Sequence, residues 1–244
     1  MNFLELVQRA RRKCRIVGVG ATPTAVTGQN EEYSRLIDWT NEAWMEIQLH
    51  QPDWYWMRRR LLFPTVDGQP LYTLADLALN GVVYDAQGTA SPFTAATFGN
   101  WAPDQFRCNT TATGFDDEQM MDWIPNFDAW RDSYLLGNMR ETRTRPTVYT
   151  IGPGLSVGLG FTPLAGYTIG GSFYLKASEM VQATDIPALP TEWHMAIVYK
   201  TMMLYGASES APEVYDDGEN WYRDFLSRML NQQLPMVETA PAMA

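Results

Sequence analysis

The segment Leu155-Ser-Val-Gly-Leu-Gly-Phe161 decides how the middle of the chain folds. Its apolar side chains stand at every second position, which is the spacing that brings them to one face of a β-strand. Four further short segments are partly alternating and are bounded by Gly, Pro, Asn or Asp, as strands usually are. These segments are Arg60 to Val66, Leu71 to Leu74, Thr147 to Ile151 and Thr168 to Lys176.

Together these segments predict an antiparallel β unit between about residues 60 and 176. Long loops are expected to interrupt this unit, because two stretches lack a clear strand pattern. These loops lie around Asp76 to Gly99 and Asp104 to Asn126, and a short helix is predicted at Asn126 to Leu136.

Helical patterns lie on both sides of the β unit. Near the N-terminus, the apolar residues from Phe3 to Cys14 recur at helical spacing. Asn2 and Glu5, three positions apart, resemble a capping box at the start of this helix. The other helical patterns run from about Asn30 to His50, from Pro190 through Leu204, and from about Pro212 onward.

The predicted fold class is therefore α+β. Residues 1–57 and 186–233 are expected to form a four-helix bundle. Residues 58–185 are expected to form an inserted antiparallel β-rich domain with long loops, because strands in the middle of the chain lie between helices at its ends. Residues 234–244 are predicted to be an extended C-terminal tail.

The charge balance excludes one class of function. The chain of 244 residues carries 18 Lys and Arg against 28 Asp and Glu, a net charge of −10. A domain that reads DNA sequence usually has a basic footprint, so this balance argues against one. No apolar stretch approaches about 20 residues, and the basic cluster of Met1 to Lys13 follows its apolar residues. We therefore expect a soluble protein without a membrane partner or a standard signal peptide.

One motif resembles catalytic machinery. Gly154-Leu-Ser156-Val-Gly158 matches the nucleophile elbow of hydrolases, and Asp185 and His194 follow in the order of their triad. An elbow needs a strand, a strained turn and then a helix, yet Ser156 lies inside an alternating strand pattern with no helix after it. We therefore predict that the chain is not an enzyme and has no catalytic residue. Ser156 is the residue whose substitution tests this prediction.

Metal and cofactor sites are also unsupported. The two histidines, His50 and His194, are far apart in sequence, and Cys14 and Cys108 have no zinc-ligand spacing. The acidic clusters at Asp116 to Asp122 and Asp216 to Glu219 lack the regular spacing of a calcium loop. We predict no metal, no cofactor and two free thiols.

Basic residues are concentrated in an otherwise acidic chain. Arg58, Arg59 and Arg60 are consecutive, and five basic residues fall between Arg9 and Arg15. Such segregation suits subunits that meet positive face to negative face. The 9 Trp and 12 Tyr favour protein interfaces, where aromatic residues and Arg are enriched. The alternative is a carbohydrate- or receptor-binding β module, in which loop residues Trp101 or Trp123 hold a glycan.

The order of several short motifs resembles the head-to-tail adaptor proteins of short-tailed bacteriophages. Each motif is a packing or turn signature, and their joint order carries the resemblance over most of the chain. The first motifs are Phe3-Leu-Glu-Leu-Val-Gln-Arg9, Thr27-Gly-Gln29, Leu36-Ile-Asp-Trp39-Thr-Asn-Glu-Ala-Trp44-Met-Glu-Ile47-Gln and Pro52-Asp-Trp54-Tyr-Trp56-Met-Arg58. The later ones are Gly68-Gln69-x-x-Tyr72-x-Leu74, Arg145-Pro146-Thr-Val-Tyr149, Phe161-Thr-Pro163, Tyr174-Leu-Lys176 and Asp185-Ile-Pro-Ala-Leu-Pro190.

The resemblance implies a structural protein of the virion head-tail junction, assembled in the host cytoplasm. It implies a homododecamer, a ring of about twelve copies, that docks beneath the portal protein and offers its other end to the tail nozzle. Tail fibres are a further partner. Genomic DNA would pass through the ring without sequence-specific binding, because a like-charged wall repels its phosphates.

Two segments are the candidate partner contacts within this reading. The tail residues Leu234, Pro235, Met236 and Val237 are expected to thread into the portal. The basic residues Arg58, Arg59 and Arg60 are the second candidate contact.

Overall fold

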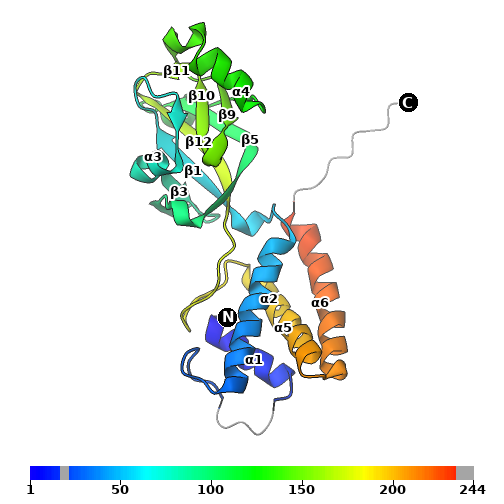
Figure 1. Cartoon of the computed structure of the whole chain (residues 1–244). Helices are drawn as coiled ribbons and strands as arrows, with labels where there is room; N and C mark the ends of the chain where they lie inside the picture. The colour runs from blue at the N-terminus through cyan, green and yellow to red at the C-terminus, as the bar shows by residue number, and fades with distance from the viewer. Residues whose placement is uncertain (17–21, 235–244) are drawn as a thin grey trace, which may run out of the picture. The chain divides into compact units, whose positions relative to one another are not determined.

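The computed structural model describes residues 1–16 and 22–234, which form two compact units (Figure 1). Residues 1–57 and the residues from 177 onward make the first, which we call the helical unit. Residues 58–176 make the second, the β unit. This mixture of helices and strands confirms the predicted α+β class.

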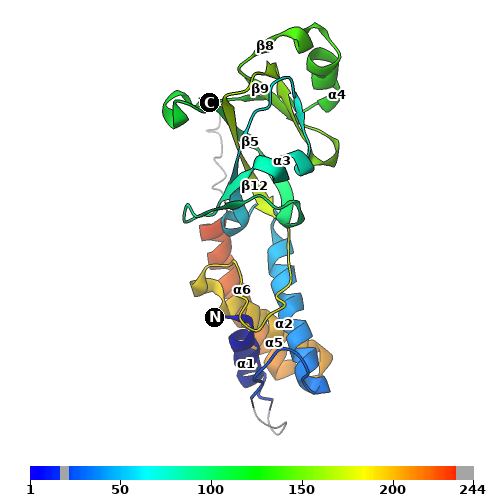
Figure 2. The same ribbon diagram turned by 90° about the vertical axis from the view of Figure 1, so that its left-hand side faces the viewer.

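Helices from both ends of the chain build the helical unit (Figure 1 and Figure 2). Helix α5 is apolar around most of its circumference, and it packs against each of the other three. Helix α6 packs chiefly on α5. The four-helix bundle arrangement itself stays a prediction. The helices are α1 (Phe3–Lys13), α2 (Glu31–His50), α5 (Met195–Ser208) and α6 (Pro212–Gln233).

The start of α1 has the predicted capping box. The Asn2 side chain accepts a hydrogen bond from the Glu5 backbone N–H, and the Glu5 carboxylate accepts one from the Asn2 N–H. Both bonds satisfy donors that the first helical turn leaves without intrahelical partners. Phe3, Leu6 and Val7 then lie on the buried face of the helix, as their spacing predicts.

The predicted boundary between the units at residue 185 is wrong, because the chain joins the helical unit from residue 177. Two amide side chains on α2 hold this segment. Gln48 Nε2 donates to the Ser178 carbonyl over 3.0 Å, and Gln48 Oε1 accepts from the Ser178 N–H over 3.1 Å. Asn41 makes the same pair of bonds with the backbone of Met180.

A six-stranded sheet forms one layer of the β unit, with the order β4-β3-β1-β12-β5-β6 and every neighbouring pair antiparallel. The central strand β12 pairs with β1 from Arg58 opposite Tyr174 to Pro64 opposite Thr168. The strands are β1 (Arg58–Pro64), β3 (Val82–Tyr84), β4 (Ala90–Pro92), β5 (Phe98–Thr110), β6 (Gln119–Met120) and β12 (Tyr167–Leu175).

Two smaller sheets complete the unit. The order of the four-stranded sheet is β2-β10-β9-β7, and β8 pairs with β11. The pairs β7/β9 and β8/β11 are parallel, so the prediction of an antiparallel unit is incomplete at these positions. The strands are β2 (Leu71–Tyr72), β7 (Asp122–Trp123), β8 (Arg143–Thr144), β9 (Val148–Ile151), β10 (Val157–Gly160) and β11 (Thr162–Pro163).

The core of the β unit lies between the six-stranded and four-stranded sheets. Phe106 from β5 stacks on Tyr149 from β9, with ring centroids 4.3 Å apart. The strand predicted in the segment that begins at Leu155 is confirmed at β10, where Val157 and Leu159 are buried in this core, but all four residues of β10 are buried, so the strand does not have the one exposed face that alternation predicts. Helix α4 (Phe127–Trp130) and one π-helical turn (Arg131–Leu135) confirm the short helix predicted there.

The two long loops predicted at 76–99 and 104–126 are wrong in large part. Helix α3 (Leu74–Asn80) begins with a capping box between Thr73 and Asp76. The long strand β5 covers residues on both sides of Asp104. Its pairing with β12 shifts between Gly170 and Ser172, which breaks the alternation that sequence analysis relies on.

Candidate interaction surfaces

The three consecutive arginines lie on β1, and the pleat of the strand separates them. Because side chains of a strand alternate in direction, Arg58 and Arg60 share one face and Arg59 points to the other. Arg58 Nη2 donates to the Gln105 side-chain carbonyl and, over 3.4 Å, to the Ser172 hydroxyl. The predicted basic cluster is therefore two arginines on one surface and one on another.

Arg59 is half-buried, on the side of β1 that carries the buried residues Leu61 and Phe63. Its Nη1 donates to the Arg58 backbone carbonyl over 2.8 Å. Burial lowers the pKa of the Arg59 guanidinium from its ordinary value, and the charge of Asp85 opposes that change. The predicted contact residues Arg58, Arg59 and Arg60 thus have different surroundings, and Arg58 and Arg60 are the pair on the polar face.

A polar concavity of about 400 Å³ opens beside Arg60 on this face. Glu118 holds two arginines there: it accepts from Arg60 Nη2 over 2.8 Å and from Arg107 Nη1 over 3.3 Å. Gly170 contributes no side chain to the floor of the concavity. A Cβ at this position would meet Leu62 Cδ2 at 3.0 Å. The basic concavity, as we call it, is lined by Arg60, Gln105, Arg107, Glu118, Gly170, Gly171 and Ser172.

The basic concavity has the chemistry of an interaction surface. Guanidinium groups present pairs of N–H donors that match a carboxylate or a phosphate. Arg60 also lies over the ring of Phe115, 5.1 Å from its centroid, and Phe115 is exposed. Met120 is exposed on the neighbouring strand β6. Arginine, aromatic and methionine side chains are enriched at protein interfaces, so this composition favours a protein partner.

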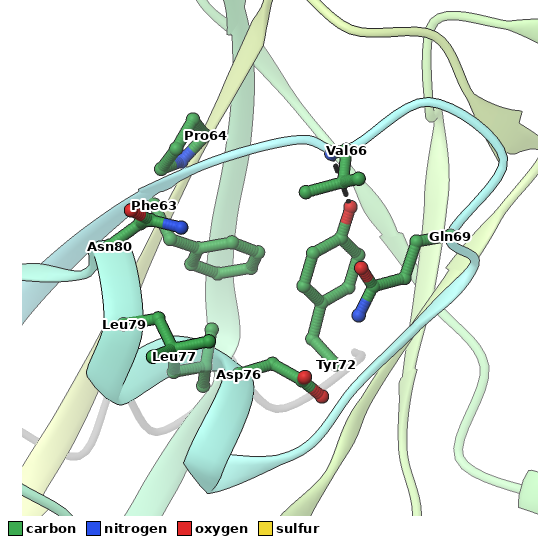
Figure 3. Close-up of a pocket in the computed structure, with 9 residues that line it drawn as sticks. All are labelled: Phe63, Pro64, Val66, Gln69, Tyr72, Asp76, Leu77, Leu79 and Asn80. Carbon is green, nitrogen blue, oxygen red and sulfur yellow. Dashed lines mark hydrogen bonds between the residues drawn. The ribbon is translucent and has the colours of Figure 1, made fainter.

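A small apolar pocket lies beneath α3 (Figure 3). Phe63, Tyr72 and Leu77 are buried in its wall, while Val66 and Leu79 are exposed at its rim. The Tyr72 hydroxyl accepts a hydrogen bond from the Val66 N–H over 2.8 Å. At about 60 Å³ the pocket is far below the roughly 300–1,000 Å³ of small-molecule sites, so it has no room for such a ligand.

The predicted tail contact begins at the end of α6. Leu234, the last residue that the structure describes, is half-buried in an extended conformation after the helix. Pro235, Met236 and Val237 lie outside the described residues.

The side chains of Ser156, Asp185 and His194, the triad candidates of the hydrolase-like motif, make hydrogen bonds with backbone groups. Ser156 lies in the β unit, where its Oγ donates to the Pro153 carbonyl over 3.0 Å. Asp185 and His194 lie in the helical unit. Asp185 accepts from two backbone N–H groups at 2.7 Å, and His194 Nε2 lies 2.8 Å from the Leu189 carbonyl.

The backbone at Ser156 also differs from an elbow. A 3₁₀ turn (Pro153–Leu155) precedes Ser156, and strand β10 follows it, so the strand–turn–helix order is missing. His194 is buried, and burial lowers the pKa of its imidazole. These contacts account for the three residues without a catalytic role.

Metal ligands do not gather in the described part of the chain, where no group of three or more His, Cys, Asp or Glu has the geometry to hold an ion. Cys14 and Cys108 are buried free thiols, as predicted. Burial raises the pKa of Cys14 to about 12, which suppresses its reactive thiolate form. None of the helices in the described ranges is long and apolar enough to cross a membrane.

The two tryptophans of the glycan alternative differ in exposure. Trp101 is only 6% exposed, and its indole N–H donates to the Leu155 carbonyl over 2.7 Å, so the loop role predicted for it is wrong. Trp123 is 43% exposed on the edge strand β7.

The arginine, aromatic and methionine side chains exposed on these surfaces are residue types enriched at protein interfaces. Residues 1–243 match a family model described as SU10 adaptor protein, so the chain belongs to the SU10 adaptor protein family. The match confirms the resemblance to bacteriophage head-to-tail adaptors. Membership indicates a structural component of the virion that interacts with portal and tail components, in a family that is not normally enzymatic. No curated protein matches the chain.

Proposed function

We propose that this chain joins the portal of a bacteriophage capsid to the tail nozzle as a ring of about twelve copies. The observation that carries the proposal is the family match, which extends over residues 1–243. The ring sits at the head-tail junction, assembles in the host cytoplasm and continues the channel for the genome, with tail fibres as a further partner.

The charge of the chain supports a channel role. Each copy carries a net charge of −10, and a ring wall that shares this charge is negative. A negative wall repels the phosphates of DNA, which lets the genome slide without sequence-specific binding.

The partner contacts follow from the two surfaces described above. The tail residues Leu234, Pro235, Met236 and Val237 contact the portal as the chain leaves α6. Arg58 and Arg60, with the basic concavity, contact a protein partner through carboxylate groups, because arginine pairs with carboxylates in bidentate geometry. The helical unit, packed as a four-helix bundle, closes the ring against its neighbours.

Mass photometry of the purified chain, alone and with its portal, tests this proposal. We expect a ring-sized species with the portal present. A chain that stays monomeric under both conditions would contradict the proposal.

The alternative of a carbohydrate- or receptor-binding module keeps one supporting observation, the exposed ring of Trp123. Aromatic faces are common stacking surfaces, and an edge strand is open to partners. A glycan-array signal that disappears in Trp123→Ala would favour this alternative, and a chain without any glycan signal would remove it.

A further inference from the structure

Helix α1 carries two exposed cations on one side. Arg9 and Arg12 are both exposed and lie three positions apart, so they are neighbours on the helix surface. Within residues 1–16 and 22–234, neither makes an ion pair or a side-chain hydrogen bond. Arg15, in contrast, lies 3.5 Å from both Glu213 and Asp217. We call Arg9 and Arg12 the α1 basic stripe.

Helix α2 carries the complementary charges. Asp38 and Glu42 are exposed and lie four positions apart, again on one side of a helix. Neither carboxylate is paired with another described residue. Their neighbour Glu46 is different, because it accepts from Lys200 Nζ over 2.6 Å. We call Asp38 and Glu42 the α2 acidic stripe.

Apolar side chains continue the acidic stripe toward the C-terminal end of α2. Met45 and Leu49 lie seven and eleven positions after Asp38, which keeps them on the same side of the helix. Leu49 is 69% exposed. A surface with charges at one end and an exposed leucine at the other resembles the mixture found at protein interfaces.

The two stripes are similar in length and opposite in charge. At about 1.5 Å of rise per residue, the cations are about 4.5 Å apart along α1 and the carboxylates about 6 Å apart along α2. Both helices use their buried sides for the core of the same unit, and the charged sides stay unpaired within one copy. Each copy therefore presents one basic and one acidic surface that fit each other but do not meet internally.

A contact between two different surfaces of identical copies is heterologous, and it closes into a ring when the rotation between copies permits. Copies that each carry −10 repel one another in general, so local pairing of opposite charges sets their orientation. We propose that the α1 basic stripe of one copy docks on the α2 acidic stripe of the adjoining copy, and that this contact repeats around the ring. The inference rests on the ring proposed above.

Charge reversal tests the contact directly. We expect R9E/R12E and D38K/E42K each to reduce ring assembly at least about tenfold, because like charges then face each other at every interface. An equal mixture of the two variants is expected to recover rings with alternating copies. In the mixture, one interface keeps the native charges and the next has both charges reversed, so every contact is again attractive.

Two matched controls accompany the variants. K176E/R223E makes the same charge change as the first variant, and D53K/E179K makes the same change as the second, at exposed positions outside both stripes. We expect both controls to form rings. The neutral variant R9Q/R12Q, with a thermal unfolding curve for every variant, separates lost pairing from lost folding.

The outcomes distinguish this inference from the function on which it rests. If the wild type forms rings with its portal and either reversed variant does so equally well, the stripes are not the interface and the adaptor role stands. Failure of the mixture to recover rings from two folded variants would also overturn the inference. If the wild type forms no ring at all, both proposals fall.

Discussion

At the residue scale, Glu118 organises the two arginines that line the basic concavity, Arg60 and Arg107. Its side chain is only 19% exposed and accepts hydrogen bonds from both Arg60 and Arg107. One carboxylate thus fixes two guanidinium groups, while Arg58 is fixed separately by Gln105 and Ser172. The concavity keeps a net positive charge, and its donors are held in place before a partner arrives.

Asp117 gives a pH-dependent prediction at the same scale. The hydrogen bond from the Thr110 hydroxyl, together with those from the Thr110 N–H and Thr113, lowers the pKa of this carboxyl from 3.8 to about 2. A depressed folded-state pKa stabilises the fold above the unfolded-state pKa, and that stabilisation is lost as the pH falls through the folded-state value. We therefore expect the midpoint temperature of unfolding to fall between about pH 4 and pH 2.

The variant Asp117→Asn checks this assignment. Because the amide does not titrate, its midpoint temperature should change less over the same pH window than that of the wild type. Parallel pH profiles for the two proteins would show that Asp117 is not a source of the acid sensitivity.

Local residue roles were predictable where their partners are close in sequence. Asn2 and Glu5 are three positions apart, so a helical repeat alone predicts their mutual capping. Arg60 and Glu118 are 58 positions apart, and the sheet order brings them together. No spacing rule connects such residues, which is why the basic concavity could not be predicted from the sequence.

At the scale of elements, β12 depends on glycine where it crosses the core. A Cβ at Gly171 would lie 2.8 Å from Phe106 Cε1, and Phe106 is fully buried. We expect Gly171→Ala to destabilise the protein by about 1–3 kcal/mol in denaturant unfolding, because the core has no room for the added methyl group.

The neighbouring Gly170 supplies the control for this prediction. It lies on the opposite face of the same strand, and its Cβ would meet a flexible side-chain atom of Leu62 at 3.0 Å. Gly170→Ala should therefore cost less than Gly171→Ala. Equal losses would mean that strand propensity, rather than contact with Phe106, sets the cost.

Two amide side chains on α2, Gln48 and Asn41, hold the segment after residue 176 at different residues. The contribution of each can therefore be tested by its own substitution. We expect Gln48→Ala to destabilise the helical unit by about 1–3 kcal/mol, because it leaves backbone groups of Ser178 unsatisfied. Hydrogen exchange should show the Ser178 amide losing protection while the Met180 amide, held by Asn41, keeps it. Loss of protection at both amides would indicate that the segment detaches as one piece.

The elements themselves were predictable to different degrees. Helices α1, α2 and α6 and the strand at Val157 follow simple periods of hydrophobicity, and their positions agree with the sequence analysis. Helix α5 begins at Met195 rather than at Pro190, and α3 was not predicted. Strand β5 was missed because its buried residues Phe98, Trp101, Phe106 and Cys108 do not alternate. The register shift against β12 changes which side chains of β5 face the core. Pro103 within the strand is also a residue more typical of loops than of strand interiors.

At the scale of the whole molecule, the β unit has its own hydrophobic core, and its first and last strands pair with each other. Its core residues lie between Leu61 and Phe173, all inside the unit, and its first strand pairs with its last from Arg58 opposite Tyr174. We expect residues 58–176 to fold alone. The two ends of this fragment lie on β1 and β12, which are paired neighbours in the sheet, so the fragment keeps their pairing. Circular dichroism with a cooperative unfolding transition would show this, and a non-cooperative fragment would contradict it.

The family-level function was accessible to sequence analysis through the order of its motifs, and the match over residues 1–243 confirms it. The surfaces that we propose for partner contacts were less accessible. Sequence clustering identified Arg58 to Arg60 but not the pleat that separates Arg59 from its neighbours. Long-range pairing of strands, rather than local composition, decides which charges share a face.

Cryo-electron microscopy of the chain assembled with its portal tests the central claim most directly. The account predicts a closed circle of about twelve copies between the portal and the nozzle, with helices of adjoining copies in contact. Density showing isolated copies on the particle surface, or an empty position at the junction, would contradict it.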